Sequence, residues 1–241
     1  MILLLDFGNT RVKAAVIENG TLRQIYCGPV VMEHLLSVVE GLEIDGGLWC
    51  SVHELDVRFQ DWMYGLGMKP LAVSTPVPLS VAYSTPETLG MDRLAAAVGA
   101  YSIKPGHDIL VIDAGTAITY DFISADGVYK GGNIAPGMSM RFKALHDYTG
   151  ALPLVASNGD LPMLGSDTAT AIRSGVLNGI RHEIDGYINE LRGIYPSLLV
   201  FLTGGDAEFF DIKGKCATFV VPNLVLEGLA QIVDYNGIQD L

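Results

Sequence analysis

The chain opens with the stretch Ile2-Leu3-Leu4-Leu5-Asp6-Phe7-Gly8-Asn9-Thr10. Its pattern is repeated, at an interval of about the length of a small domain, by Asp108-Ile109-Leu110-Val111-Ile112-Asp113-Ala114-Gly115-Thr116. In both stretches a short apolar run ends in an aspartate, with a glycine two residues further on. An apolar run of this length, bounded by turn residues, is typical of a buried strand. The repetition therefore predicts two similar units, each beginning with a strand and a tight turn.

Each opening strand is followed by the pattern of two more strands with short connections. After the first stretch, apolar residues at 12–17 and 22–27 are separated by Glu18-Asn19-Gly20, and after the second, 118–123 leads through Asp126-Gly127 into a further strand. Short turns of this kind join antiparallel neighbours. Each unit is thus predicted to open with a three-strand antiparallel meander.

Helical and strand patterns alternate in the rest of the chain. Helical spacing predicts helices over 32–39, 54–64, the segment from Thr85-Pro86-Glu87 to Lys104, 138–146, a long segment carrying apolar residues from 172 to 191, and a last helix opened by Pro222. Further strands are predicted at 48–52, 71–73 and 198–202. The prolines of Thr75-Pro76-Val77-Pro78 predict a loop or linker.

These patterns predict an α/β protein of two similar domains, each a mixed sheet that opens with the meander and is flanked by helices. We place the N-terminal domain at 1–104 and the C-terminal domain at 105–241, because the pattern restarts after Lys104-Pro105-Gly106.

Composition excludes several classes of protein. The 241 residues are 49% hydrophobic and 17% charged, which excludes a disordered chain, and no apolar run approaches the 18 or so residues of a membrane-spanning helix. The net charge of −12 would repel a nucleic acid backbone. Met1 is followed directly by the first strand, without the basic region of a signal peptide. A soluble cytoplasmic protein is expected, and the high apolar content suggests a subunit interface.

The cysteines and histidines form no recognisable metal or disulfide pattern. Cys27, Cys50 and Cys216 are widely spaced and odd in number, which suits a reducing compartment. The histidines lack ligand spacing, so no zinc site is predicted. The Gly-x-x-x-x-Gly-Lys-Ser/Thr, Gly-x-Gly-x-x-Gly and Gly-x-Ser-x-Gly motifs are also missing from the sequence.

Asp6 and Asp113 are the first candidates for chemistry. A glycine after each allows a close approach of an anion to main-chain amides, while the carboxylate can bind Mg²⁺ directly or through its waters. The alternative for either copy alone is ordinary turn chemistry. The pair, together with a third glycine turn at Thr203-Gly204-Gly205-Asp206, favours a phosphate clamp. Lys13 is either a counter-charge to phosphate or a solvated surface residue.

Gly90-Met91-Asp92-Arg93 lies where a helix is predicted to begin. A helix N-terminus attracts anions, the Arg93 guanidinium matches a carboxylate, and Asp92 can accept a hydroxyl proton. The alternative makes Asp92 a helix-start acid with Arg93 as its surface partner. Further along, the segment from Gly131 to Gly137 is predicted to be a tight loop before a helix, and by itself it could be a plain connection.

Taken together, these segments resemble type III pantothenate kinases of bacteria, members of the acetate and sugar kinase, Hsp70 and actin superfamily. The resemblance covers nearly the whole chain and is carried by six elements in order: Asp6-Phe7-Gly8-Asn9-Thr10-Arg11, Gly90-Met91-Asp92-Arg93, Asp113-Ala114-Gly115-Thr116-Ala117, Gly131-Gly132-Asn133-Ile134-Ala135-Pro136-Gly137, Gly165-Ser166-Asp167-Thr168 with Ala171-Ile172, and Thr203-Gly204-Gly205-Asp206.

The resemblance implies actin/ribonuclease H-like domains and a homodimer. It implies ATP-dependent phosphorylation of the primary hydroxyl of pantothenate to 4'-phosphopantothenate, the first step towards coenzyme A. The cofactors would be ATP with Mg²⁺ and a monovalent cation, K⁺ or NH₄⁺.

The resemblance also implies roles for particular residues. Asp92 would be the catalytic proton acceptor, Asp113 would hold the monovalent cation, and Asp6 would serve Mg²⁺ through phosphate. The residues implied in ATP binding are Asp6, Phe7, Gly8, Asn9, Thr10, Arg11, Val12, Lys13 and Thr116. Those implied in pantothenate binding are Tyr83, Gly90, Met91, Asp92, Arg93 and Thr168.

Three other functions remain open on the sequence. One is a kinase of another small hydroxylated substrate, such as acetate or a sugar, which the Gly-x-Asp-Arg segment argues against. Another is a catalytically silent regulator that binds nucleotide, although such a protein is expected to lose an acid at position 6, 92 or 113. The third is an actin-like filament protein. The apolar stripe from Ile172 to Leu191 belongs either to the chain's own core or to a subunit interface.

Overall fold

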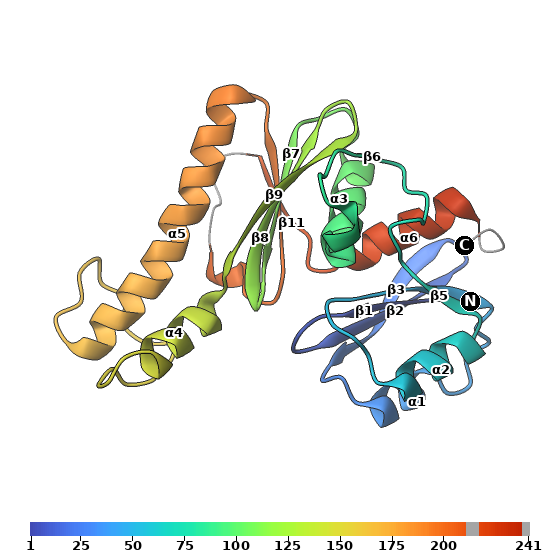
Figure 1. Cartoon of the computed structure of the whole chain (residues 1–241), viewed down its shortest axis with the longest axis horizontal. Coiled ribbons are helices and arrows are strands. Elements are labelled where there is room, and N and C mark those ends of the chain that lie inside the picture. Colours follow the sequence, from blue (N-terminus) through green and yellow to red (C-terminus); the bar gives the residue numbers. More distant parts are fainter. Residues whose placement is uncertain (211–216, 238–241) are drawn as a thin grey trace. The chain divides into compact units, whose positions relative to one another are not determined.

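The computed structural model describes residues 1–210 and 217–237 of the chain (Figure 1). Cys216, one of the three cysteines expected to be free, lies outside the described residues. No helix in the described part of the chain is long and apolar enough to cross a membrane.

The first sheet contains the predicted meander. Its strand order is β3-β2-β1-β4-β5, in which β1 (Ile2–Phe7), β2 (Val12–Glu18) and β3 (Thr21–Gly28) are antiparallel. The strands β4 (Gly46–Ser51) and β5 (Met68–Pro70) continue the sheet in parallel with β1. The predicted meander is confirmed, because apolar runs and Gly- or Asn-containing turns alternate at strand length.

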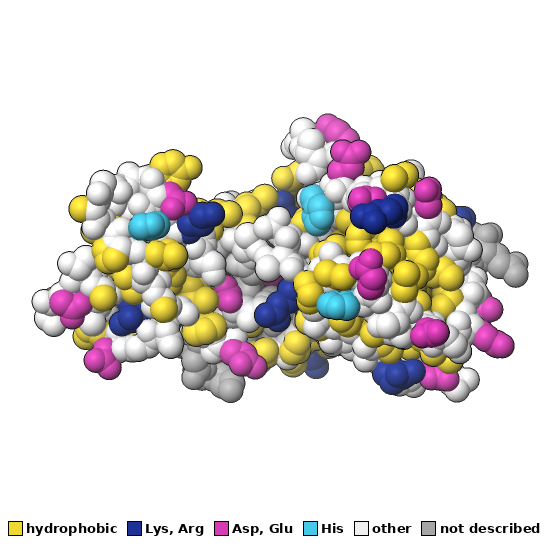
Figure 2. All heavy atoms as spheres, turned by 90° about the horizontal axis from the view of Figure 1, so that it is seen from below, with side chains coloured by type: hydrophobic (Ala, Val, Ile, Leu, Met, Phe, Trp, Pro, Cys, Tyr) yellow, Lys and Arg dark blue, Asp and Glu magenta, His cyan; other side chains and the backbone are white. Residues whose placement is uncertain are grey.

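One face of this sheet packs on α1 (Met32–Val39) and α2 (Val57–Gly65). Its core includes Leu3, Leu5, Phe7, Val12 and Ala14, which alternate with the residues of the opposite face as strand geometry requires. Figure 2 shows hydrophobic side chains spread over α1 and α2, and basic side chains separated by acidic and uncharged ones.

The second sheet repeats the order of the first. Its order is β11-β10-β7-β8-β9-β6, so that β9-β8-β7-β10-β11 matches β3-β2-β1-β4-β5. The strands are β6 (Ser80–Val81), β7 (Ile109–Ala114), β8 (Ala117–Ser124), β9 (Val128–Pro136), β10 (Leu199–Thr203) and β11 (Thr218–Val220). The chain is therefore an α/β protein of two similar mixed sheets flanked by helices, as the repeated opening strand predicts, and this is the actin/ribonuclease H-like arrangement that the resemblance implies.

The remaining helices are α3 (Met91–Ile103), α4 (Met138–Asp147), α5 (Thr168–Ile194) and α6 (Leu224–Asn236), with short 3-10 turns at Pro86–Thr88 and Ala207–Phe209. Helices α3 and α6 pack closely together and contact β4 and β1 of the first sheet (Figure 1). A Cβ at Gly228 would collide with the Ala95 carbonyl, and one at Gly99 would lie 2.5 Å from the Leu224 carbonyl oxygen. Glycine at both positions lets the two backbones approach.

Residue contacts divide the chain into two compact units. The first contains 1–107, 122–131 and 223–241, and the second contains 108–121 and 132–222. Helix α6, although last in the chain, groups with the first unit because it packs on α3. The division into duplicated domains at 104/105 concerns where the repeat begins in the sequence, and it stays a prediction.

Two local predictions are wrong. The segment 131–136 is not a tight loop but the second half of β9, because Gly132 lies so close to the Tyr120 carbonyl of β8 that any side chain would collide with it. The glycines there serve close strand packing rather than a turn. The strand predicted at 71–73 is β5 at Met68–Pro70, displaced by three residues towards Gly67.

The apolar stripe of the long helix belongs to the chain's own core. Its residues Ile172, Val176, Ile180, Ile184 and Ile188 are buried within the chain. The stripe therefore gives no support to a subunit interface.

Candidate active site

Asp6 lies at the centre of a row of three side chains across the first sheet. It is directly opposite Lys13 on β2 and Cys50 on β4, so all three side chains point to the same face. This is the face on which α3 and α6 pack. The thiol of Cys50 donates a hydrogen bond to Asp6 Oδ1, at 3.7 Å from sulfur to oxygen.

The environment of Asp6 disfavours its charged form. The pKa of Asp6 is raised to about 6: burial raises it most, Lys13 lowers it, the Asp92 carboxylate raises it, and the Cys50 hydrogen bond lowers it. The protein side chains thus compensate the negative charge only in part. A site with incompletely compensated negative charge fits a bound cation. The charge of Asp92 acts on Asp6, so α3 brings the two acids near each other.

The turn after Asp6 has a clear division between core and surface. Phe7 and Val12 point into the core, where the ring of Phe7 makes edge contacts with Trp49 and Phe59. Gly8 N–H donates to the Arg11 carbonyl at 2.9 Å, which closes a tight turn whose residues Asn9, Thr10 and Arg11 are exposed. Phe7 and Val12 therefore offer a ligand only their backbone, while the turn offers both backbone and side chains.

The start of α3 presents Asp92 and Arg93 in different settings. Gly90 is the N-cap, and a Cβ there would lie 2.5 Å from Asp92 Oδ1, so the carboxylate folds back over the first turn of the helix. Arg93 is only 6% exposed, which rules out the alternative of a surface partner. Its guanidinium carbon lies 6.0 Å from the centre of the Tyr83 ring.

Tyr83 is held beside Arg93 by β9. Its ring centre lies 6.1 Å from that of Tyr129, and a Cβ at Gly131, where φ is +107°, would meet the ring at 3.4 Å. The sequence around Tyr83 contains no rigid motif, but the fold places the residue beside one that the sequence did single out.

The second unit contains an equivalent strand end at Asp113. Asp113 lies opposite Thr203 of β10, just as Asp6 lies opposite Cys50 of β4. Gly204 has a φ of +96°. A Cβ there would lie 2.5 Å from Asp113 Oδ1 and would collide with the Ala114 carbonyl. Gly204 is thus packed directly against this strand end, where Asp206 N–H also donates to the Ala114 carbonyl at 2.9 Å. Thr116 follows on the same turn, and its carbonyl accepts from Gly137 N–H at 2.9 Å.

Thr168 is the first residue of α5 and is exposed. Asp167 caps this helix and accepts from Thr170 N–H at 3.0 Å, while the Thr170 hydroxyl bonds back to Asp167. The capping box fixes where the helix begins and hence where Thr168 stands.

The fold therefore groups the predicted residues in two sets. In the first unit, Asp6, Lys13 and Asp92 lie together. Arg93 follows Asp92 at the start of α3, and the Tyr83 ring lies beside the Arg93 guanidinium. In the second unit, Asp113 and Thr116 lie together beside Gly204, and Thr168 begins α5. The sequence did not identify Cys50 as a neighbour of Asp6, although pairing the strands 2–7 and 46–51 in register would have done so.

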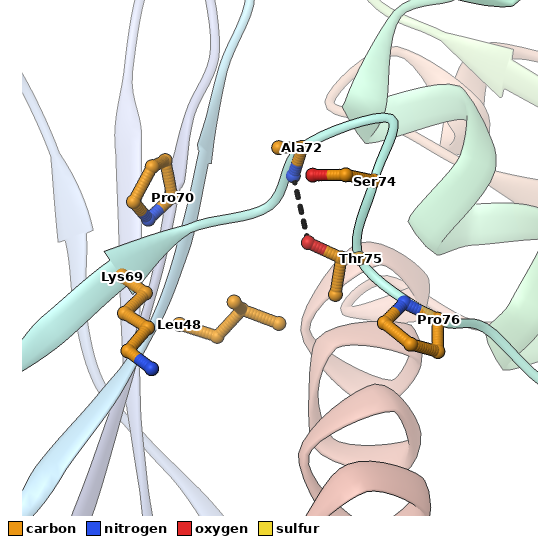
Figure 3. A pocket seen from close by; sticks show the side chains of 7 residues that line it. All are labelled: Leu48, Lys69, Pro70, Ala72, Ser74, Thr75 and Pro76. Carbon is orange, nitrogen blue, oxygen red and sulfur yellow. Dashed lines mark hydrogen bonds between the residues drawn. The ribbon is translucent and has the colours of Figure 1, made fainter. Parts of the chain in front are cut away.

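A pocket of about 270 Å³ lies elsewhere in the first unit (Figure 3). It is lined by Leu48, Lys69, Pro70, Ala72, Ser74, Thr75 and Pro76. None of the predicted site residues lines it. Ala72 N–H donates to Thr75 Oγ1 at 3.1 Å and Thr75 N–H donates to the Ala72 carbonyl at 2.9 Å, and both bonds stabilise the chain turn.

We expect Asp6→Asn to stabilise the unliganded protein at pH 8. In the unfolded chain Asp6 ionises near its ordinary pKa of 3.8, and in the folded protein near 6, so stability falls as pH rises between these values. The substitution removes this cost, worth roughly 3 kcal/mol at most. Melting temperatures between pH 4 and 8 measure it. The gain should shrink below pH 6, and an equal gain for the exposed control Asp61→Asn would contradict the explanation.

Comparison with known proteins shows which family the chain resembles. The family model for type III pantothenate kinases matches residues 2–190. A type III pantothenate kinase of Phocaeicola vulgatus is 48% identical over 242 residues, covering 98% of this chain and 99% of that protein. A second, from Bacteroides fragilis, is 45% identical over 239 residues and covers 98% of both chains.

A solved structure from Campylobacter jejuni, named as a Baf family transcriptional activator, has the same fold. It aligns with a TM-score of 0.65 at 23% identity and covers 98% of each chain. At this identity the likeness concerns the fold alone, whereas the family model covers residues 2–190 and the two relatives cover 98% of the chain. The chain belongs to the type III pantothenate kinase family.

Proposed function

We propose that this chain is a cytoplasmic kinase that transfers the γ-phosphoryl group of ATP to the primary hydroxyl of pantothenate, giving 4'-phosphopantothenate. The observation that carries the proposal is the meeting of Asp92, at the start of α3, with Asp6, at the end of β1, in a chain of this family. Asp92, which can accept a proton, thus lies beside Asp6, which suits a metal-bound phosphate.

Asp92 is the proposed general base. Phosphoryl transfer to an alcohol depends on positioning and on a group that accepts the hydroxyl proton. Arg93 supplies a fork of donors for the pantothenate carboxylate, and the Tyr83 ring beside it limits how the guanidinium can turn. Gly90 and Met91 complete this side of the substrate site, and Thr168 contacts pantothenate from the start of α5.

The phosphates of ATP are proposed to bind along the segment from Asp6 to Lys13. The exposed turn at Gly8 to Arg11 offers amides and Lys13 offers positive charge, and Thr116 is a further proposed ATP contact. Mg²⁺, when bound with ATP, neutralises charge that develops on the phosphates. Asp6 would serve this ion through the phosphates, and its incompletely compensated charge supports that role.

Asp113 is the proposed ligand of the monovalent cation, K⁺ or NH₄⁺. We expect Asp113→Ala to lose the dependence of activity on K⁺, because the substitution removes one oxygen ligand with its charge. Initial rates measured over a range of KCl, with NaCl keeping ionic strength constant, check this. Wild-type K⁺ dependence in the variant would contradict the assignment whatever its total rate.

A homodimer is proposed in which Thr168 of one subunit reaches the pantothenate held by Arg93 of the other. The apolar stripe of α5 gives this homodimer no support, because it is buried in the chain's own core. Other apolar side chains, which are exposed, do support the homodimer. Between α4 and α5 the exposed fractions are 89% for Tyr148, 62% for Leu154, 72% for Met163 and 84% for Leu164. Large apolar side chains this exposed mark an interaction surface, and Leu164 lies four residues before Thr168.

A coupled assay of ADP release, with pantothenate and with or without K⁺, tests the function. Pantothenate-dependent release is expected. Release with acetate or a sugar instead would favour another small-molecule kinase, and nucleotide binding without turnover would favour a silent regulator. Assembly into filaments with ATP, seen by sedimentation, would favour the actin-like alternative.

A further inference from the structure

We propose that Cys50 is a positioning residue, which holds the Asp6 carboxylate in place for MgATP by donating the hydrogen bond from its thiol. The inference rests on the proposed function, since it concerns the phosphate side of the same site. Nothing in the sequence distinguishes Cys50 from the other cysteines, and the assignment comes from the pairing of β1 with β4.

The register of the strands fixes this contact. Asp6 and Cys50 are partners in the parallel pair β1–β4, and Lys13 is the partner of Asp6 on the other side. The carboxylate thus has a cation on one flank and a thiol donor on the other. Cys50 is 1% exposed, so water cannot replace the thiol as a donor on that flank.

The second unit repeats the arrangement. Thr203, which is 1% exposed, is the partner of Asp113 in the parallel pair β7–β10, and its hydroxyl donates to the Pro222 carbonyl at 3.4 Å. A small side chain with one hydrogen-bond donor therefore stands beside each strand-end aspartate. In the second unit this donor is used by the backbone, whereas in the first it is used by the aspartate itself.

The chemistry of Cys50 suits a donor rather than a nucleophile. The thiol donates to the Asp6 carboxylate, and Cys50 is 1% exposed, so it is closed to reagents from solvent. A thiol is a weak donor. Cys50→Ser keeps a donor, while Cys50→Ala removes it and leaves the space open.

The test measures MgATP binding by calorimetry and the kinetics of the full-length protein. Loss of one hydrogen bond predicts that Cys50→Ala binds MgATP about threefold to tenfold more weakly, with the KM for pantothenate unchanged. Cys50→Ser should restore binding to within about twofold of the wild type on the same reasoning. Cys27→Ala removes an exposed thiol from β3 of the same sheet and should leave binding unchanged.

A double mutant distinguishes a positioning role of Cys50 from a general loss of structure. If Cys50 acts through Asp6, then Cys50→Ala added to Asp6→Asn should weaken binding no further. The proposal is overturned if Cys50→Ala binds MgATP like the wild type, if serine and alanine are equally impaired, or if the full effect persists beside Asp6→Asn. Should Cys50→Ala fail to fold, Cys50→Val fills the space without a donor and takes its place. A wild-type protein that binds MgATP but releases no ADP would overturn the proposed function alone.

Discussion

Replacing Asp92 by asparagine is expected to lower kcat by about 10²- to 10⁴-fold, the usual contribution of a positioned general base. Asparagine has nearly the same shape and can take the same place in the first turn of α3, but it cannot accept the hydroxyl proton. The KM for pantothenate should change much less, because Arg93 and Tyr83 remain in place. Steady-state kinetics with pantothenate and ATP give both values.

The control for this experiment is Asp61→Asn, which changes an exposed aspartate of α2 in the same way. Its turnover and melting temperature should match the wild type. An Asp92→Asn variant that melts normally and keeps near-normal turnover would remove Asp92 from the mechanism.

Replacing Arg93 by alanine is expected to lower kcat/KM for pantothenate by roughly 30- to 3,000-fold. Deleting one partner of a buried charge pair costs about 2–5 kcal/mol, and each tenfold corresponds to about 1.4 kcal/mol. Arg93→Lys keeps the charge without the planar fork and should recover only part of the loss. The KM for ATP should stay near the wild-type value, and a loss confined to ATP would contradict a carboxylate-binding role.

The same variant tests the shared site of the proposed dimer. Arg93→Ala and Thr168→Ala subunits, each inactive alone, are mixed and refolded together. A site built from two subunits predicts that activity returns, because each heterodimer has one site with both residues intact. No recovery at any mixing ratio would show that each subunit carries a complete site of its own.

The strands were predictable where the local sequence, through apolar runs and turn residues, determines the structure. The meander β1–β2–β3 follows from apolar runs cut by Asn19-Gly20 and Gly8-Asn9, and the six main helices follow from apolar spacing. The second half of β9 was not predictable, because a run of glycines is locally indistinguishable from a loop. Only the approach of the Tyr120 carbonyl to Gly132, a contact between strands, shows what the glycine is for.

The site was predictable in its residue types and less so in its groupings. Aspartates at strand ends and an acid at a helix start are visible in the sequence, yet nothing local states that α3 brings Asp92 to Asp6. That contact depends on how α3 packs on the sheet. The burial of Arg93 and the place of Tyr83 beside it depend on tertiary packing in the same way.

The close packing of α6 on α3 has a consequence for synthesis of the protein. Domains generally fold in the order in which the ribosome releases them. Here 223–237 complete the first unit, so the Ala95 and Gly99 surface of α3 stays uncovered until the final helix emerges, whereas the second unit is complete by residue 222. The half that is encoded first is therefore finished last, and the nascent chain carries an open apolar surface for most of its translation.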